Sequence, residues 1–107
     1  TLNNTTYVEA ARLLASSVLK EKLTDQEILD LIYQRVVTRL PREKEIPILL
    51  AGLAHDRQQF AANNDNVISF LGVGDSPVEP NLDPVELASW TNLCIAVLNL
   101  DESLTRQ

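Results

Sequence analysis

Apolar residues recur along most of this chain three and four residues apart, a spacing that places them on one face of an α-helix. The first such stretch predicts a helix over residues 7–21, and Thr6 followed by Glu9 at its start has the spacing of a capping box. The polar residues expected on the outer side of this helix are Arg12, Ser16 and Lys20.

A second apolar stripe predicts a helix that begins after Thr24 and stops near Arg39. Thr24 and Glu27 repeat the capping-box spacing, and Pro41 disfavours helical geometry at the residue before it. Because only two or three residues separate this helix from the first, the two are expected to be antiparallel neighbours.

A third helix is expected over residues 43–62, where Pro47 is tolerated because the first turn of a helix does not need its amide proton. The break at residues 63–65 ends this helix and can cap a short fourth one over residues 66–71. The stretch 72–82 is rich in glycine and proline, which predicts a surface loop. The expected buried side of the third helix consists of Ile46, Leu49, Leu50, Leu53 and Phe60.

A final helix is expected over residues 83–98. Its first residues, Asp83-Pro84 with Glu86 two positions later, combine three helix-start signals. The residues from Leu93 to Leu98 are all apolar, so they cover the whole circumference of the helix, and such a helix is buried on several sides. The expected end is Asn99, followed by a polar tail.

No stretch sustains the alternation of apolar and polar residues that is typical of a strand. We therefore predict an all-α fold, in which residues 1–107 form a single compact bundle of four to five helices around the buried C-terminal helix. That helix contains the only tryptophan, Trp90, and the only cysteine, Cys94. Cys94 has apolar neighbours and is expected in the core rather than as a reactive thiol.

Charge is unevenly distributed along the chain. Residues 1–57 contain eight acidic and eight basic residues, whereas residues 58–105 contain seven acidic residues and no lysine or arginine. This argues against binding to nucleic acid or to an anionic membrane surface, since both require a basic surface. No apolar run reaches the roughly 18 residues that span a bilayer. The chain contains no methionine, even at its start, so we expect an excised piece of a larger protein.

The residue types that carry chemistry do not occur in the patterns that chemistry needs. A zinc site needs a cluster of cysteine and histidine, and the chain has one of each. His55, which adjoins polar residues, is expected to be exposed rather than a ligand or a base. Haem-attachment, phosphate-binding and calcium-binding motifs are absent. We therefore predict no catalytic, cofactor-binding or metal-binding residue and disfavour an enzyme.

Several segments carry a family resemblance. Residues 7–12 are similar to an opening "FVEAAR", residues 73–77 to a loop "VGESP", and residues 87–91 and 97–102 to "LAAWT" and "LLNLDE" near the end of the same pattern. Residues 38–41 resemble a turn "GRPP" but have threonine where glycine is usual. Taken in order, these segments resemble the C-terminal part of the DUF1553 (PSD1) domain of planctomycete proteins.

This resemblance implies a bacterial source and a place at the C-terminal end of a larger exported or periplasmic protein. Such proteins often carry a DUF1549 domain and a cytochrome c-like domain, so any haem would belong to another part of the parent. The family implies no catalytic residue, because its function is unknown.

Two functions remain open. The first is a non-catalytic helical module that packs against other domains of its parent, or against a protein partner, through an exposed apolar patch. The alternative is a module that binds an extracellular polysaccharide or a cation through the acidic segment 63–86. The aromatic side chains available for a glycan are Tyr7, Tyr33 and Trp90, each of which can also be a core residue.

Overall fold

A computed structural model describes residues 4–105 of the chain, with side chains described for residues 4–100. Over this range the chain forms helices and no strand, which confirms the all-α prediction. The radius of gyration of 13.1 Å is that of a compact chain of this length. The helices are α1 (Thr5–Leu19), α2 (Asp25–Val36), α3 (Glu45–Ala62), α4 (Asn64–Leu71) and α5 (Pro84–Thr105).

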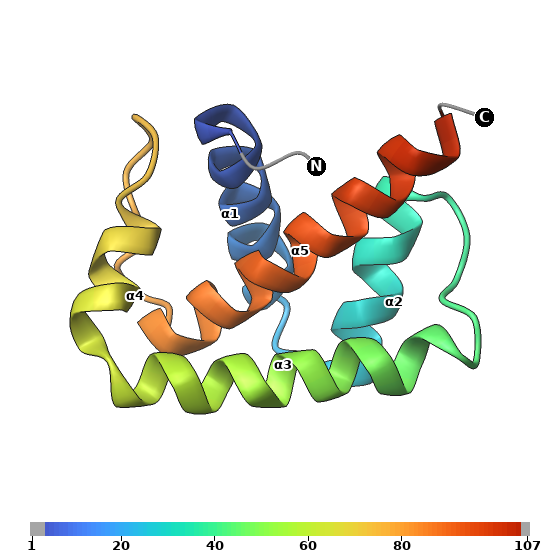
Figure 1. Cartoon of the computed structure of the whole chain (residues 1–107), viewed down its shortest axis with the longest axis horizontal. Helices are drawn as coiled ribbons and strands as arrows, with labels where there is room; N and C mark the ends of the chain where they lie inside the picture. Colours follow the sequence, from blue (N-terminus) through green and yellow to red (C-terminus); the bar gives the residue numbers. More distant parts are fainter. Residues whose placement is uncertain (1–3, 106–107) are drawn as a thin grey trace.

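The C-terminal helix α5 packs against all four other helices. It crosses α1 and α2, which run in opposite directions, and α3 runs along one edge of the molecule (Figure 1). Trp90 and Cys94 are fully buried at the centre of this arrangement, as predicted. Burial raises the pKa of the Cys94 thiol, so it stays neutral at physiological pH.

Three helix starts form through the predicted local hydrogen bonds. Thr24 and Glu27 make the complete capping box of α2. Asn63 accepts a hydrogen bond from the amide of Asn66 at the start of α4, and Asp83 accepts one from the amide of Val85 at the start of α5.

The start of α1 differs from the prediction. Asn4, rather than Thr6, is the capping residue, and its side chain accepts a hydrogen bond from the amide of Tyr7 at 3.1 Å. The predicted capping box was therefore wrong. The Glu9 carboxylate bonds instead to the loop between α4 and α5, which explains why it does not turn back to the helix start.

The outer side predicted for α1 was wrong for two of its three residues. Arg12 is only 1% exposed and Ser16 is buried, whereas Lys20 is exposed as expected. For Arg12 the reason is tertiary, because the loop 72–82 lies against this part of α1 and accepts hydrogen bonds from the arginine side chain.

The contact between α1 and the loop has defined chemistry. The Arg12 guanidinium donates to the carbonyl oxygens of Ser76 at 2.7 Å and Pro77 at 3.1 Å, and the Ser76 amide donates to Glu9 at 2.6 Å. Hydrogen bonds from the side chain and the amide of Ser76 lower the pKa of Glu9. Gly74 has a φ of 92°, and a Cβ there would lie 2.6 Å from the Glu9 carboxyl carbon, so only glycine fits without movement.

The second and last helices end elsewhere than predicted. α2 ends at Val36 because Thr38 turns the chain with a φ of 61°, the left-handed conformation that favours glycine after a helix. This is the position where the resembled turn usually has glycine. α5 continues through Asn99 to Thr105, and Leu100 packs against the core, so the apolar stripe prevails over the weak stop signal.

Arg57 connects three helices at one end of the bundle. From α3 it donates to Asp25 at the start of α2 at 2.8 Å and to Glu86 in the first turn of α5 at 2.6 Å. Its guanidinium carbon also lies 5.9 Å from the centre of the Trp90 ring. The hydrogen bond from Arg57 lowers the pKa of Asp25. Glu86, expected as a helix-start signal, thus also joins α5 to α3.

A second arginine organises the turn between α2 and α3. Arg39 makes two hydrogen bonds with the Glu45 carboxylate, at 2.9 and 3.1 Å, and its guanidinium carbon lies 5.3 Å from the centre of the Tyr33 ring. The hydrogen bonds from Arg39 lower the pKa of Glu45 to about 2.

Replacing Glu45 with glutamine is expected to make the domain about 1 kcal/mol less stable at pH 7. Since the pKa of Glu45 falls from 4.5 to about 2 on folding, its ionised form stabilises the fold above pH 4.5. That contribution disappears as the pH falls from 4.5 to about 2. Urea unfolding of both proteins at pH 7 and near pH 2 tests this. The exposed Glu43, replaced in the same way, is the control, and a pH-independent difference for Glu45→Gln would contradict the prediction.

Candidate functional site: a groove between α3 and α5

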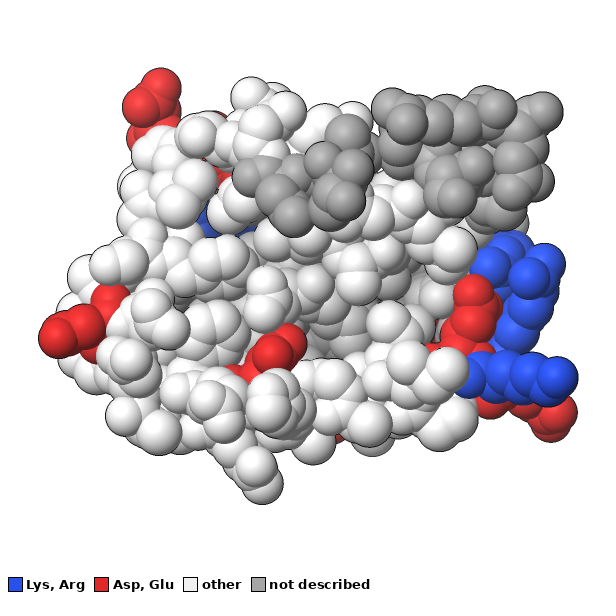
Figure 2. All heavy atoms as spheres, viewed as in Figure 1, with Lys and Arg blue, Asp and Glu red and all other residues white. Residues whose placement is uncertain are grey.

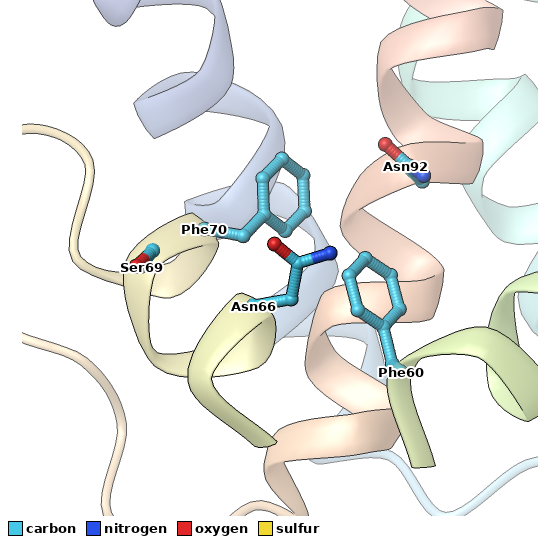
Figure 3. Close-up of a pocket in the computed structure, with 5 residues that line it drawn as sticks. All are labelled: Phe60, Asn66, Ser69, Phe70 and Asn92. Carbon is cyan, nitrogen blue, oxygen red and sulfur yellow. The ribbon is translucent and has the colours of Figure 1, made fainter. Parts of the chain in front are cut away.

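Three adjoining hollows follow the line where α3 and α5 meet, and we call them together the seam groove. The first, of about 390 Å³, lies between α3, α4 and α5 (Figure 3). The second, of about 280 Å³, lies at the middle of the two helices, and the third, of about 220 Å³, lies where Tyr33 of α2 forms the floor. The groove is continuous because neighbouring hollows share lining residues. The first and second hollows share Asn92, and the second and third share Ile48, Leu49 and Ala96.

Small side chains keep the middle of the groove open. Gly52 of α3 and Ala96 of α5 both line the second hollow and are exposed. A Cβ added at Gly52 would meet no atom within 4 Å, so the glycine leaves room above the helix. Beside it, Ile48 is 72% exposed and is the most exposed large hydrophobic residue of the described chain.

The groove is apolar over most of its length. Its third hollow is lined by five uncharged residues, among them Leu49 and Leu100, and by Glu45, which is paired with Arg39. Figure 2 shows this face of the molecule as largely uncharged, with lysine and arginine gathered at the end where α3 begins. Arg42 and Lys44 are exposed there. The arrangement suits contact with an apolar surface.

Polar groups occur at two places in the groove. At the middle, Asn92 donates from its amide to the half-buried Asp56 carboxylate at 3.3 Å. In the first hollow, Asn66 of α4 lies beside Phe60 and Phe70, whose rings stack with their centres 5.6 Å apart. Ser69 of the same helix also lines this hollow. These groups allow the groove to orient a ligand that is otherwise held by apolar contact.

Three of the five acidic side chains on which the alternative prediction rests have structural partners. In the acidic segment 63–86, Glu79 pairs with Lys20 at 3.0 Å, Asp83 caps α5, and Glu86 bonds to Arg57. Within the described part of the chain, no three acidic, histidine or cysteine side chains are grouped so that they could hold a metal ion. Trp90 and Tyr33 belong to the core, and Tyr7 is half-buried.

The lone histidine and the lone cysteine lie apart. His55 is exposed on α3, as predicted, whereas Cys94 is in the core of α5. A nucleophile and a base are thus not brought together by these two residues.

The seam groove was not predicted from the sequence, although the sequence contains a pattern that indicates it. The nine residues from Ile46 to Ala54 contain no charged or polar side chain, which is the same all-round apolar pattern as in the last helix. In α5 most of the residues in that pattern pack into the core, although Ala96 is exposed. In α3 only Leu53 of this stretch is fully buried, and the opposite side, including Ile48, is exposed.

Among the described residues, no helix combines the length and the hydropathy needed to cross a membrane. Comparison of the chain with protein-family models, with curated proteins and with solved structures found no match.

Proposed function

We propose that this domain is a non-catalytic helical module of a larger bacterial protein and that it docks another domain of that protein in the seam groove. The observation that carries the proposal is the exposed side of α3. Nine successive apolar residues make a helix that would be buried all round in a complete assembly, yet one side of it faces solvent. Covering this side would remove Ile48 from water.

The side chains at the middle of the groove support docking of another domain there. Gly52 and Ala96 allow close approach of another backbone, and Asn92 and Asp56 provide polar groups at the middle. Interfaces of this kind combine an apolar centre with a few polar contacts.

The resemblance to the C-terminal part of DUF1553 supports the choice of occupant. It would place this domain in a longer, exported chain, so that the segment covering the groove comes from the same parent. Two segments that carry the resemblance, residues 7–12 and 73–77, contact each other in the fold through Glu9, Arg12 and Ser76. Those residues therefore have a structural role in joining the loop to α1.

Replacing Ile48 with aspartate is expected to weaken the binding of this domain to the rest of its parent at least about tenfold, because a carboxylate would be buried in an apolar contact. Isothermal titration calorimetry of the separately produced parts measures the affinity. The isolated domain should change in stability by no more than about 0.5 kcal/mol, since Ile48 is 72% exposed in it.

Ile68→Asp provides the matched control. Ile68 is 63% exposed on α4 and does not line the groove, so the same substitution there should leave the affinity unchanged. Equal losses for both variants, or no loss for Ile48→Asp, would contradict docking in the seam groove.

A further inference from the structure

We infer that the seam groove binds a basic amphipathic helix: a single helix with apolar side chains at both ends of its contact face and a lysine or arginine between them. This inference rests on the proposed docking function and names the chemistry of the segment that docks. It follows from the charge at the middle of the groove and from the spacing of the hollows.

The charge at the middle of the groove is not balanced by the described chain. The Asp56 carboxylate is half-buried, and its one described hydrogen bond comes from the neutral amide of Asn92. The basic residue next to it, Arg57, is bonded to Asp25 and Glu86. An occupant that covers the groove would therefore bury a carboxylate without a cation unless it brought one.

The helices around Asp56 contain few cations. The segment 58–105, which includes α4 and α5, has no lysine or arginine, and the Arg39 side chain of the α2–α3 turn is held by Glu45. The groove therefore favours a partner with positive charge at its centre, and it disfavours one with negative charge there.

The hollows on either side of Asp56 define two apolar anchors. Along α3, Ile48 is eight residues before Asp56 and Phe60 is four residues after it. At 1.5 Å per residue these separations are about 12 Å and about 6 Å. A helix lying along α3 would match them with one apolar residue about two turns from its basic residue and another about one turn away on the other side.

A helix fits this site better than an extended segment. The groove runs along α3 from Glu45 to Phe60, which corresponds to about 22 Å, or about four turns of a second helix. Gly52 and Ala96, at its middle, have the small side chains that allow two helices to approach closely.

The test is a selection from a display library of single helices, randomised at their target-facing positions, against the intact domain. Enriched sequences are expected to carry lysine or arginine between two apolar residues at the spacing given above. Synthetic peptides of the enriched sequence are then compared with versions in which glutamate replaces the basic residue. By fluorescence anisotropy, the exchange should weaken binding to the wild-type domain at least about tenfold.

Three variants assign the contacts. Asp56→Asn keeps the shape of the side chain and should remove the preference for the basic peptide over the acidic one, whereas Ile48→Asp should abolish binding of both. Ile68→Asp should bind as the wild type does. Circular dichroism of each variant verifies that it is folded.

The outcomes separate the two proposals. If Ile48→Asp abolishes binding but the wild-type domain does not discriminate between basic and acidic peptides, docking in the groove is supported. The inference that the docked helix is basic is then wrong. If Ile48→Asp leaves binding unchanged, or if no helix is enriched, docking of a helix in the seam groove is wrong as well. Self-association of the domain that Ile48→Asp abolishes would identify a second copy as the occupant and overturn the inference.

Discussion

Replacing Arg12 with methionine is expected to destabilise the domain by about 2–3 kcal/mol and to release the loop 72–82 from α1. Arg12 is 1% exposed, and its guanidinium satisfies the carbonyl oxygens of Ser76 and Pro77. Methionine has a similar length and keeps the aliphatic packing, but it leaves both carbonyls without their donor. Urea unfolding measures the stability, and hydrogen exchange of the Ser76 amide measures release of the loop.

The size of this effect depends on two opposed contributions. Burying a guanidinium costs free energy, and the substitution recovers that cost. It also removes two charge-assisted hydrogen bonds, each worth about 1.5–3 kcal/mol. The guanidinium of arginine is more weakly hydrated than the ammonium of lysine, so burying it costs less free energy. We therefore expect the loss of the two hydrogen bonds to exceed the burial cost that methionine recovers.

Arg35→Met is the matched control. Arg35 is an exposed arginine that donates to the Ser17 hydroxyl at 2.9 Å, so its loss should cost no more than about 0.5 kcal/mol. An Arg12→Met protein as stable as the wild type, with unchanged exchange at Ser76, would show that the cost of burying the charge cancels its hydrogen bonds.

Replacing Trp90 with alanine is expected to cost about 3–5 kcal/mol, the largest effect of any substitution proposed for this chain. Trp90 is fully buried in α5, and its ring also lies under the Arg57 guanidinium. Small domains have total stabilities of about 5–15 kcal/mol, so the variant should melt far below the wild type or be unfolded at 25 °C. Thermal unfolding followed by circular dichroism measures this.

Trp90→Phe keeps the fold measurable and separates volume from hydrogen bonding. The indole nitrogen of Trp90 is buried and has no hydrogen-bond partner among the described residues. Phenylalanine therefore removes ring volume without breaking a hydrogen bond, and we expect a cost of about 1–2 kcal/mol. A Trp90→Phe variant as unstable as Trp90→Ala would contradict this and would indicate a hydrogen bond to the indole.

The fold class and most helix starts could be predicted from the sequence, because they depend on short-range patterns. The capping box of Thr24 and Glu27 closes within four residues, and the spacing of apolar side chains sets which face of each helix turns inward. The burial of Trp90 and Cys94 followed from the same spacing in α5.

The seam groove could be predicted only in part from the sequence. The uninterrupted apolar stretch from Ile46 to Ala54 indicates a helix with contacts on two sides, which is a property of the sequence. Which side stays open depends on where α5 crosses α3, and the Asp56–Asn92 pair exists only because that crossing brings the two residues together from 36 positions apart. The interpretation of Glu9 as a capping residue failed for a similar reason.

The sequence by itself thus determined that the chain forms helices, where most of them begin, and that the last one lies in the core, because these features arise from interactions within a few turns. Only the tertiary structure decided that Arg12 is buried, that Glu9 serves a loop 67 residues away, and that one side of α3 is left uncovered. The physical reason is that a polar side chain finds its partner wherever the packed helices bring one within about 3 Å, and that position is set by all of the helices together.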